Sequence, residues 1–297
     1  MGNKIDGKKW QRESVAKEQK SVSYGHNNHT GAGIFVHGYI VENWIIKVNF
    51  GIICQEVFML SREQILLNNL QEVQNSVESA CSRAGRSPQE VTLLVVTKYA
   101  KDEDVLALLK TGQITDIGES RLQQACKRWQ ENPSFAPFGK VRKHFIGHLQ
   151  KNKAAKAAQF FDFLDSLDDF ETAALVAKHL PKGKVMRVLV QIKLTDRDTQ
   201  NGLPLEEARQ LVARLKAAQI PGLKVCGYMA IAPQGASIAQ LRALFSRVKK
   251  AFDADFSSLS EKYLSLGMSE DFVTAVEEGS SLPRIGSRLF ANHLEEV

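Results

Sequence analysis

Residues 91–100 read VTLLVVTKYA, and this stretch decides between the two large classes of α/β fold. Its first seven residues form a short, mostly apolar run, which is typical of a strand buried on both faces of a parallel sheet. A doubly wound open sheet usually carries a glycine-rich turn after its first strand. Here Lys98-Tyr99-Ala100 follows the run, without glycine. The stretch therefore favours a closed barrel.

The rest of the chain repeats this pattern of an apolar run followed by a segment of helical spacing. The further runs are 115–118, 144–147, 163–166, 185–194, 223–230, 263–267 and 283–286. The helical segments are 102–111, 120–131, 149–161, 168–180, 204–218, 238–254, 269–278 and 287–294. Parallel neighbours need crossover helices, so eight such units in roughly 205 residues predict a (β/α)8 TIM-type barrel as one domain. A cap at Ser61 and apolar spacing from Ile65 predict a helix before the barrel.

Residues 1–58 differ in composition from the predicted barrel domain, which we place at 59–297. The first thirty-odd residues are polar, and the extension as a whole is expected to be disordered or not native. Residues 34–58 are rich in Ile, Val and Phe without a clear period, which fits one or two strands, a partner-binding segment, or sequence absent from the natural product. Met59 opens an ordinary protein start, and the hypothesis follows that translation begins there.

Composition excludes several classes of function. The formal net charge of +6 is small for 297 residues, so we expect no nucleic-acid partner. The four cysteines are far apart and form no C-x-x-C pair, which predicts reduced thiols in a cytoplasmic protein and no metal centre. The longest apolar stretch, 39–60, is interrupted by charged and polar residues, so neither a membrane span nor a secretory signal is expected.

The predicted strand ends carry the candidate site residues, because a barrel of this type places its site at the carboxyl ends of its strands. These positions are Lys98, Glu119, Ser120, His148, Asp165, Ser166, Lys193, Met229, Met268, Ser269, Gly286 and Ser287. Lys98 ends an apolar run, where desolvation would favour the uncharged amine that attacks an aldehyde. The alternative for Lys98 is a strand-capping lysine whose amine reaches water.

A phosphate is expected at the loops after strands seven and eight, SLGMSED (265–271) and RIGSRLF (284–290). Each loop has a glycine for close backbone approach and then a serine that opens a helix, Ser269 and Ser287. Plain helix capping is the alternative for both serines. Arg284 lies within strand eight, where a buried guanidinium needs an acid or a ligand atom as partner.

The two histidines of HFIGHLQKNK (144–153) are four residues apart, with no acidic or cysteine ligand nearby. A metal site is therefore not expected there, and His148 is placed at the rim of the cavity. Walker, G-x-S-x-G and H-E-x-x-H motifs are absent from the sequence, and we assign no catalytic residue.

Several segments together resemble the pyridoxal phosphate homeostasis proteins of the YggS or PROSC type, whose barrel is similar to the N-terminal domain of alanine racemase. They are LLVVTK (93–98), IGESR (117–121), HFIGHLQKNK (144–153), VLVQIKL (188–194), GYMAI (227–231), LSLGMSED (264–271) and RIGSRLF (284–290), and the GESR form looks cyanobacterial.

The resemblance implies that Lys98 holds pyridoxal 5′-phosphate as a Schiff base. It further implies that Ser269, Gly286 and Ser287 bind the phosphate and that Arg284 faces the pyridine nitrogen. The sequence departs from the family at 199–202, where TQNG replaces a more usual Lys-Ser-Gly ending. That departure puts in doubt a lysine thought to help move the cofactor.

We expect a carrier of this vitamin B6 cofactor rather than an enzyme. Such a protein acts in intracellular pyridoxal phosphate homeostasis, and so in amino-acid and keto-acid balance, with apo-enzymes as acceptors and without robust catalysis. The alternative is an amino-acid racemase or decarboxylase, which needs an acid or base on the far side of the cofactor. About eleven residues follow strand eight, too few for a second domain, so a monomer without such a group is expected. A third hypothesis is a regulatory interaction protein that uses residues 1–58.

Overall fold

The computed structural model describes residues 21–26, 34–41, 44–48, 57–195 and 200–292, with side chains from residue 60 onward. The chain divides into two compact units, Met1–Ser61 with His293–Val297 and Arg62–Asn292. Each unit is described by itself.

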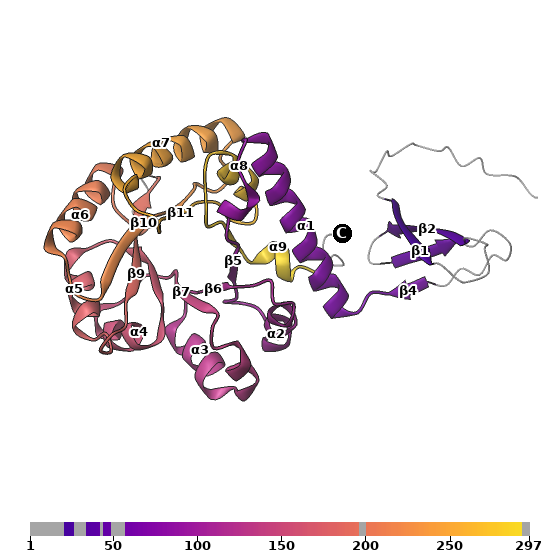
Figure 1. Ribbon diagram of the computed structural model, residues 1–297, viewed down its shortest axis with the longest axis horizontal. Coiled ribbons are helices and arrows are strands. Elements are labelled where there is room, and N and C mark those ends of the chain that lie inside the picture. Colours follow the sequence, from indigo (N-terminus) through magenta and orange to yellow (C-terminus); the bar gives the residue numbers. More distant parts are fainter. Residues whose placement is uncertain (1–20, 27–33, 42–43, 49–56, 196–199, 293–297) are drawn as a thin grey trace, which may run out of the picture. The chain divides into compact units, whose positions relative to one another are not determined.

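The larger unit is a barrel of eight parallel strands with helices between them (Figure 1). The order of neighbouring strands is β11-β10-β9-β8-β7-β6-β5-β12, and every ladder is parallel. This confirms the predicted TIM-type fold. The strands are β5 (Leu94–Val96), β6 (Asp116–Glu119), β7 (Arg142–Phe145), β8 (Phe163–Leu167), β9 (Met186–Lys193), β10 (Leu223–Ile231), β11 (Tyr263–Ser265) and β12 (Arg284–Ile285).

Backbone hydrogen bonds close the barrel between its first and last strands in this order. The N–H of Arg284 donates to the carbonyl oxygen of Gly267 at 3.0 Å, and the N–H of Leu282 donates to Leu264 at 3.1 Å. Closure leaves little unpaired sheet edge, which suits a sheet whose two faces are both covered.

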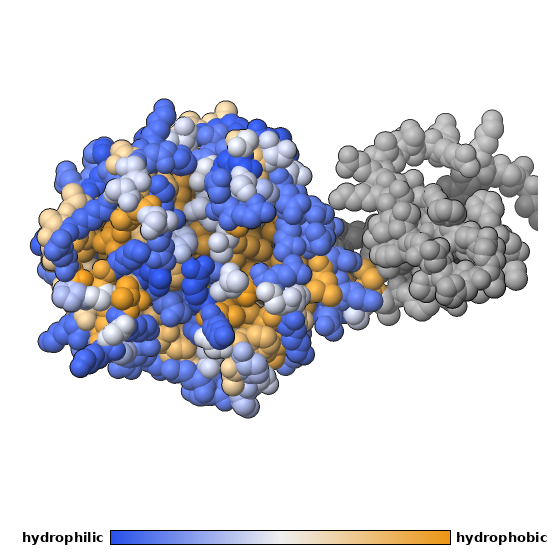
Figure 2. Space-filling model, in the orientation of Figure 1, coloured by the Kyte–Doolittle hydropathy of each residue, from blue (hydrophilic) through white to orange (hydrophobic). Residues whose placement is uncertain are grey.

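Helices form the outer ring, and α1 precedes the barrel as predicted (Figure 1). Figure 2 shows hydrophilic residues around the outside of this unit and hydrophobic residues gathered toward the centre of the face in view. No described helix is both long and apolar enough to cross a membrane. The helices are α1 (Arg62–Arg83), α2 (Asp102–Lys110), α3 (Leu122–Cys126), α4 (Ala154–Phe160), α5 (Phe170–Lys178), α6 (Leu205–Ala218), α7 (Ile238–Phe256), α8 (Phe272–Glu277) and α9 (Ser287–Phe290), with shorter turns η1 (Pro88–Glu90), η2 (Lys127–Glu131), η3 (Pro133–Phe138) and η4 (Lys151–Lys153).

Alternation along β5 separates the inside of the barrel from the helix-covered outside. Leu94 belongs to the buried cluster within the barrel, whereas Val95 packs with α1 and α2. Val96 returns to the inside, because a Cβ added at Gly118 would contact the side chains of Leu94 and Val96 at 3.4 and 3.5 Å. Lys98 continues this inward series at the mouth of the barrel.

The third strand begins earlier than predicted. The apolar run pointed to residues 144–147, but β7 spans Arg142–Phe145. Charged residues at its start escape a pattern based on apolar runs, yet Arg142 is neutralised by Asp116, to which its guanidinium donates at 2.8 Å. His144, the first residue of the predicted strand, is the third residue of β7 and is fully buried.

The smaller unit contains an antiparallel sheet in the order β1-β2-β3-β4. Its strands are β1 (Ser21–His26), β2 (Ile34–Val41), β3 (Trp44–Val48) and β4 (Val57–Met59). Residues 34–58, for which one or two strands were one of three alternatives, thus contain β2, β3 and most of β4. Whether residues 1–58 are ordered in solution and belong to the natural product stays a prediction.

Candidate functional site

The ladder between β12 and β5 brings two of the predicted site segments together. Ile285 pairs with Val95, so Gly286 comes opposite Val96. The approach is close, because a Cβ added at Gly286 would lie 3.0 Å from the carbonyl oxygen of Val96. Lys98 follows Val96 by two residues, and Ser287 follows Gly286. Both residues therefore lie at the mouth of the barrel beside this seam.

A hydrogen bond joins the two loops predicted to bind a phosphate. The backbone N–H of Arg288 donates to Oγ of Ser269 at 3.4 Å. Ser269 is half-buried and Ser287 is exposed. The carboxylate of Asp271 accepts the N–H of Met268 at 2.6 Å and holds the first loop. The hydroxyl of Ser269 and the backbone N–H of Arg288, from two different loops, thus meet at one place, and groups of these kinds suit an anion.

Lys98 is half-buried beside an exposed aromatic ring. Its Nζ lies 5.2 Å from the ring centre of Tyr99, and Cζ of Arg121 lies 4.9 Å from the same centre. Tyr99 is 76% exposed, so the lysine amine stands at the boundary between the barrel interior and water. A lysine in that position is accessible to a small aldehyde.

Arg284 is buried inside the barrel, as expected, and its partners are neutral oxygens. The Nη1 donates to the backbone and hydroxyl oxygens of Ser265 at 2.8 and 2.9 Å, and Nη2 donates to the carbonyl of Ala230 at 2.8 Å. Burial lowers the pKa of Arg284 to about 10, although the charges of Asp165 and Asp271 oppose that change. An acid or a ligand atom was expected as its partner, but none of its described hydrogen bonds reaches a carboxylate; two backbone oxygens and one hydroxyl accept instead.

Two of the strand-end acids do not line the mouth. Glu119 was expected there but points away from the barrel interior, where its Oε1 accepts from Thr97 and from Arg128 at 2.8 and 2.9 Å. Asp165 lies in the barrel interior and accepts from Nδ1 of His144 at 2.9 Å. His148 is half-exposed, as a rim position requires.

Arg128 is a buried arginine that sequence reasoning missed. It follows α3 in the turn η2 and contacts the segment that carries Lys98. A usable signal was present, because Arg128 falls at helical spacing on the same face as the apolar Leu122 and Ala125, where a charge must find partners.

A second missed feature is a chain of ionisable groups across the barrel interior. His144 lies between two carboxylates, with Nε2 2.8 Å from Asp116 and Nδ1 2.9 Å from Asp165, and its ring stacks on Phe163 at 3.9 Å between centres. Burial opposes protonation of His144, but Asp165 and Asp116 outweigh it and raise its pKa to about 9. We therefore assign a protonated His144 at neutral pH.

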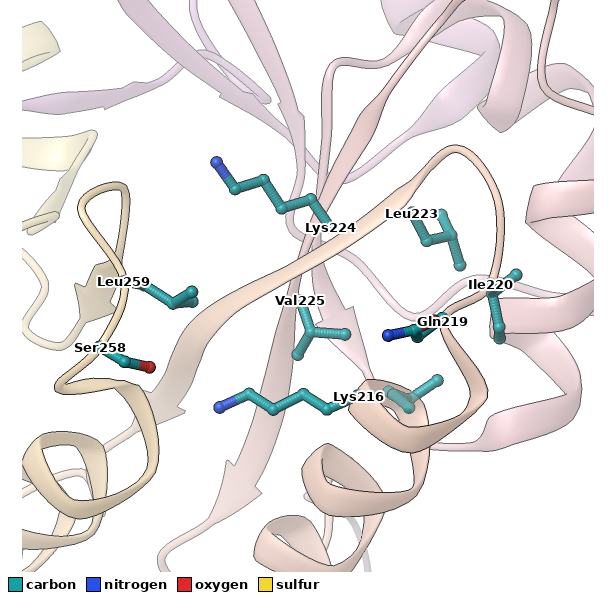
Figure 3. A pocket seen from close by; sticks show the side chains of 9 residues that line it. Lys216, Gln219, Ile220, Leu223, Lys224, Val225, Ser258 and Leu259 are labelled. Atoms are coloured by element: carbon teal, nitrogen blue, oxygen red, sulfur yellow. The ribbon is translucent and has the colours of Figure 1, made fainter.

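A surface pocket of about 270 Å³ lies at the other end of the barrel (Figure 3). It is lined by the end of α6, the start of β10 and the segment after α7, with Leu223, Val225 and Leu259 among its apolar walls. These residues stand at the amino ends of the strands, opposite Lys98. The pocket is therefore separate from the site at the mouth.

Comparisons with known proteins identify the family. The profile described as "Alanine racemase, N-terminal domain" matches residues 68–293. The pyridoxal phosphate homeostasis protein of Escherichia coli K12 is 32% identical over an alignment of 232 residues, and the match covers 76% of this chain and 95% of that protein. The protein of the same name from Synechocystis is 34% identical and is covered to 94%. The chain belongs to the pyridoxal phosphate homeostasis protein family.

Solved structures agree with this family assignment. PipY of Synechococcus elongatus, solved with PLP bound, is 28% identical with a TM-score of 0.61, and the match covers 73% of this chain and all of PipY. An alanine racemase of Clostridium difficile shares the fold at a TM-score of 0.55 and 14% identity, over 75% of this chain and 56% of the racemase.

Proposed function

We propose that this protein carries pyridoxal 5′-phosphate as a Schiff base on Lys98 and acts in the homeostasis of that cofactor. The observation that carries the proposal is the β5–β12 register, which pairs Val95 with Ile285. This register brings the amine-bearing end of β5 beside the loop of Gly286 and Ser287. Pyridoxal phosphate carries an aldehyde and a phosphate. It therefore needs an amine that reacts with the aldehyde and a phosphate-binding site at the same mouth.

The residues present fit the chemical groups of the cofactor. Gly286 approaches the backbone of Val96 so closely that a side chain would be crowded, and the lack of a side chain lets a phosphate oxygen come near the backbone. Ser269, already joined to the neighbouring loop, adds a hydroxyl. Arg284 holds a charge among neutral oxygens at the same end of the barrel. A guanidinium only donates hydrogen bonds, so it would face an unprotonated pyridine nitrogen.

When bound, pyridoxal phosphate would supply an aldehyde, and the amine of Lys98 would hold its carbon as an imine, the aldehyde oxygen leaving as water. The other residues bind and orient. An arginine opposite the pyridine nitrogen keeps that nitrogen unprotonated and so weakens the ring as an electron acceptor. That effect favours storage of the cofactor over chemistry on amino acids.

Coverage of the relatives supports a carrier without robust catalysis. The chain matches 95% of the Escherichia coli homeostasis protein but only 56% of the alanine racemase chain. A racemase requires an acid or base on the far side of the cofactor, and a closed site that excludes water. We propose pyridoxal phosphate as ligand, apo-enzymes as acceptors, a monomeric state and, from the widely spaced cysteines, a cytoplasmic location.

The proposal is tested by the absorbance spectrum after incubation with pyridoxal phosphate. The wild-type protein is expected to turn yellow, and Lys98→Ala is expected to lose the absorbance band. Lys110→Ala is the control, because Lys110 is an exposed lysine on the outer ring, at the end of α2. A colourless wild type, or a band lost equally in both variants, would refute the Schiff base at Lys98.

A racemase or decarboxylase is the second candidate, favoured by the fold shared with alanine racemase. It predicts steady turnover of one amino acid that disappears in Lys98→Ala. Measurement of product formation over many equivalents of protein distinguishes the two functions, because a carrier gives none.

A further inference from the structure

Arg128 binds the backbone on both sides of Lys98. Its Nη1 donates to the carbonyl oxygen of Thr97 at 3.1 Å, and its Nη2 donates to that of Ala100 at 2.7 Å. These two carbonyls bracket Lys98 and Tyr99. The guanidinium therefore fixes the turn that carries the lysine at two points, from outside the barrel.

The guanidinium is itself held by two carboxylates. Nε donates to Asp102 at 2.7 Å and Nη1 to Glu119 at 2.9 Å, while the arginine side chain is 3% exposed. A planar fork with several donors suits this arrangement, whereas a lysine amine could not reach both carbonyls and both acids in one geometry. Arg128 thus has little freedom to move.

Glu119 connects this arginine to the strand. Its Oε1 also accepts the hydroxyl of Thr97 at 2.8 Å, so the residue before Lys98 is bound through its side chain as well as its carbonyl. Burial raises the pKa of Glu119, and Arg128 and Thr97 oppose that rise. The network lies wholly behind the strand end and leaves the mouth open.

We propose that Arg128 and Glu119 are positioning residues that orient Lys98 for attack on the aldehyde of the cofactor. This inference rests on the function proposed above. A reacting amine displaced by about 1 Å can lose about a hundredfold in rate, so a support of this kind affects capture of the aldehyde more than binding of the phosphate.

The test compares pyridoxal 5′-phosphate with pyridoxine 5′-phosphate, which has a hydroxymethyl group in place of the aldehyde and cannot react with an amine. Arg128→Met is expected to slow Schiff-base formation about tenfold to a hundredfold, measured by the growth of absorbance. Its affinity for pyridoxine phosphate should equal that of the wild type. The rate of Schiff-base formation in Arg128→Lys should lie between those of the wild type and Arg128→Met. Glu119→Gln keeps an acceptor for Thr97, so its rate should fall less than that of Arg128→Met.

Arg86→Met is the matched control. The Nη1 of Arg86 also binds two backbone carbonyls, those of Val276 and Ser280 at 2.8 and 2.9 Å, but away from Lys98. Arg86→Met should lose thermal stability as Arg128→Met does, but its rate of Schiff-base formation should equal that of the wild type. The positioning role would be overturned if Arg86→Met and Arg128→Met slowed Schiff-base formation equally. It would also be overturned if Arg128→Met weakened binding of pyridoxine phosphate as much as capture of pyridoxal phosphate.

The remaining outcomes are also decisive. If Arg128→Met fails to fold, Arg128→Lys and Glu119→Gln take its place, and wild-type capture rates in both would reject the inference. If the wild type itself binds both ligands alike and forms no Schiff base, the proposed function fails and this inference fails with it. If the wild type forms the Schiff base and the Arg128 variants form it at the same rate, the positioning role is rejected and the proposed function stands.

Discussion

In the proposed function, Lys98 and Arg284 have different tasks at the mouth of the barrel. Lys98 is half-buried beside the ring of Tyr99, and we propose that its amine reacts there with the aldehyde. Arg284 is buried and bound to Ser265 and Ala230, and we propose that its charge serves recognition of the cofactor. One basic residue would thus serve covalent chemistry and the other orientation.

Replacement of Arg284 by methionine is expected to weaken binding of pyridoxal phosphate roughly tenfold to a hundredfold. A hydrogen bond from a charged donor contributes roughly 1.5–3 kcal/mol, and it is lost here. The free energy of unfolding should change less than the free energy of binding. Removal of a buried charge that is poorly compensated stabilises the protein, and this offsets the cost of leaving the carbonyls of Ser265 and Ala230 without a donor. Titration of the absorbance band and thermal unfolding measure the two effects. Wild-type affinity in this variant would exclude Arg284 from the site.

Strand ends of a closed barrel converge, so the strand count placed Lys98, Ser269, Gly286 and Ser287 among twelve candidate positions, and the family resemblance singled out these four as cofactor-binding residues. The structure brings these four residues to one mouth. Arg128 could not be assigned in this way, since its role depends on which carbonyls a side chain from another element reaches. His144 was placed in a strand from the sequence, but no acidic residue was expected near it; Asp116 and Asp165 reach it from the neighbouring strands β6 and β8, and a pattern based on apolar runs does not reveal such ion pairs.

At the scale of elements, the charged chain through β6, β7 and β8 couples stability to pH. The pKa of His144 rises from 6.5 to about 9 in the folded protein. A raised pKa contributes stability that is fully present below pH 6.5 and is lost as pH rises through 9. The rise in the pKa of His144 corresponds to a contribution of about 3 kcal/mol to the free energy of unfolding.

His144→Gln is therefore expected to flatten the fall in unfolding free energy between pH 6.5 and 9. Denaturant unfolding at several pH values measures this slope. His148→Gln replaces a half-exposed histidine and should keep the wild-type slope. The same slope in His144→Gln and the wild type would contradict a protonated His144.

The turn between β11 and α8 depends on Gly267. Its φ is +88°, and a Cβ there would lie 2.6 Å from Cβ of Ala275 and 2.8 Å from Cα of Phe272. The turn leads directly into the loop of Ser269. Backbone conformation and crowding both exclude a side chain at this position.

Gly267→Ala should destabilise the protein and weaken phosphate binding. Gly85→Ala is its control, since Gly85 has φ +64° but nothing within 4 Å of an added Cβ. The control should lose about 1 kcal/mol from backbone strain, and Gly267→Ala about 1–3 kcal/mol more from crowding. Thermal unfolding and binding of inorganic phosphate report both effects. Equal losses in the two variants would mean that the contacts at Gly267 do not matter.

At the scale of the whole molecule, the barrel unit holds its own core. Helix α1 is tied to the end of the unit, since Nη2 of Arg62 donates to the carbonyl of Phe290 at 2.9 Å and Nδ2 of Asn69 donates to Leu289 at 2.9 Å. The start and the end of the unit Arg62–Asn292 are therefore connected to each other by hydrogen bonds within that unit.

A chain that begins at Met59 is expected to fold and to bind pyridoxal phosphate with the affinity of the full chain. The barrel core and every proposed site residue lie within it. Thermal unfolding and the absorbance titration compare the two proteins. An insoluble or non-binding truncated chain would contradict the domain boundary and favour a functional role for residues 1–58.

We propose that Lys98 captures the cofactor. The most direct measurement is reduction of the pyridoxal phosphate complex with borohydride, followed by proteolysis and peptide mapping by mass spectrometry. We predict one stoichiometric phosphopyridoxyl adduct on the peptide that contains Lys98. No adduct, or an adduct spread over several surface lysines with Lys98 unmodified, would contradict the account.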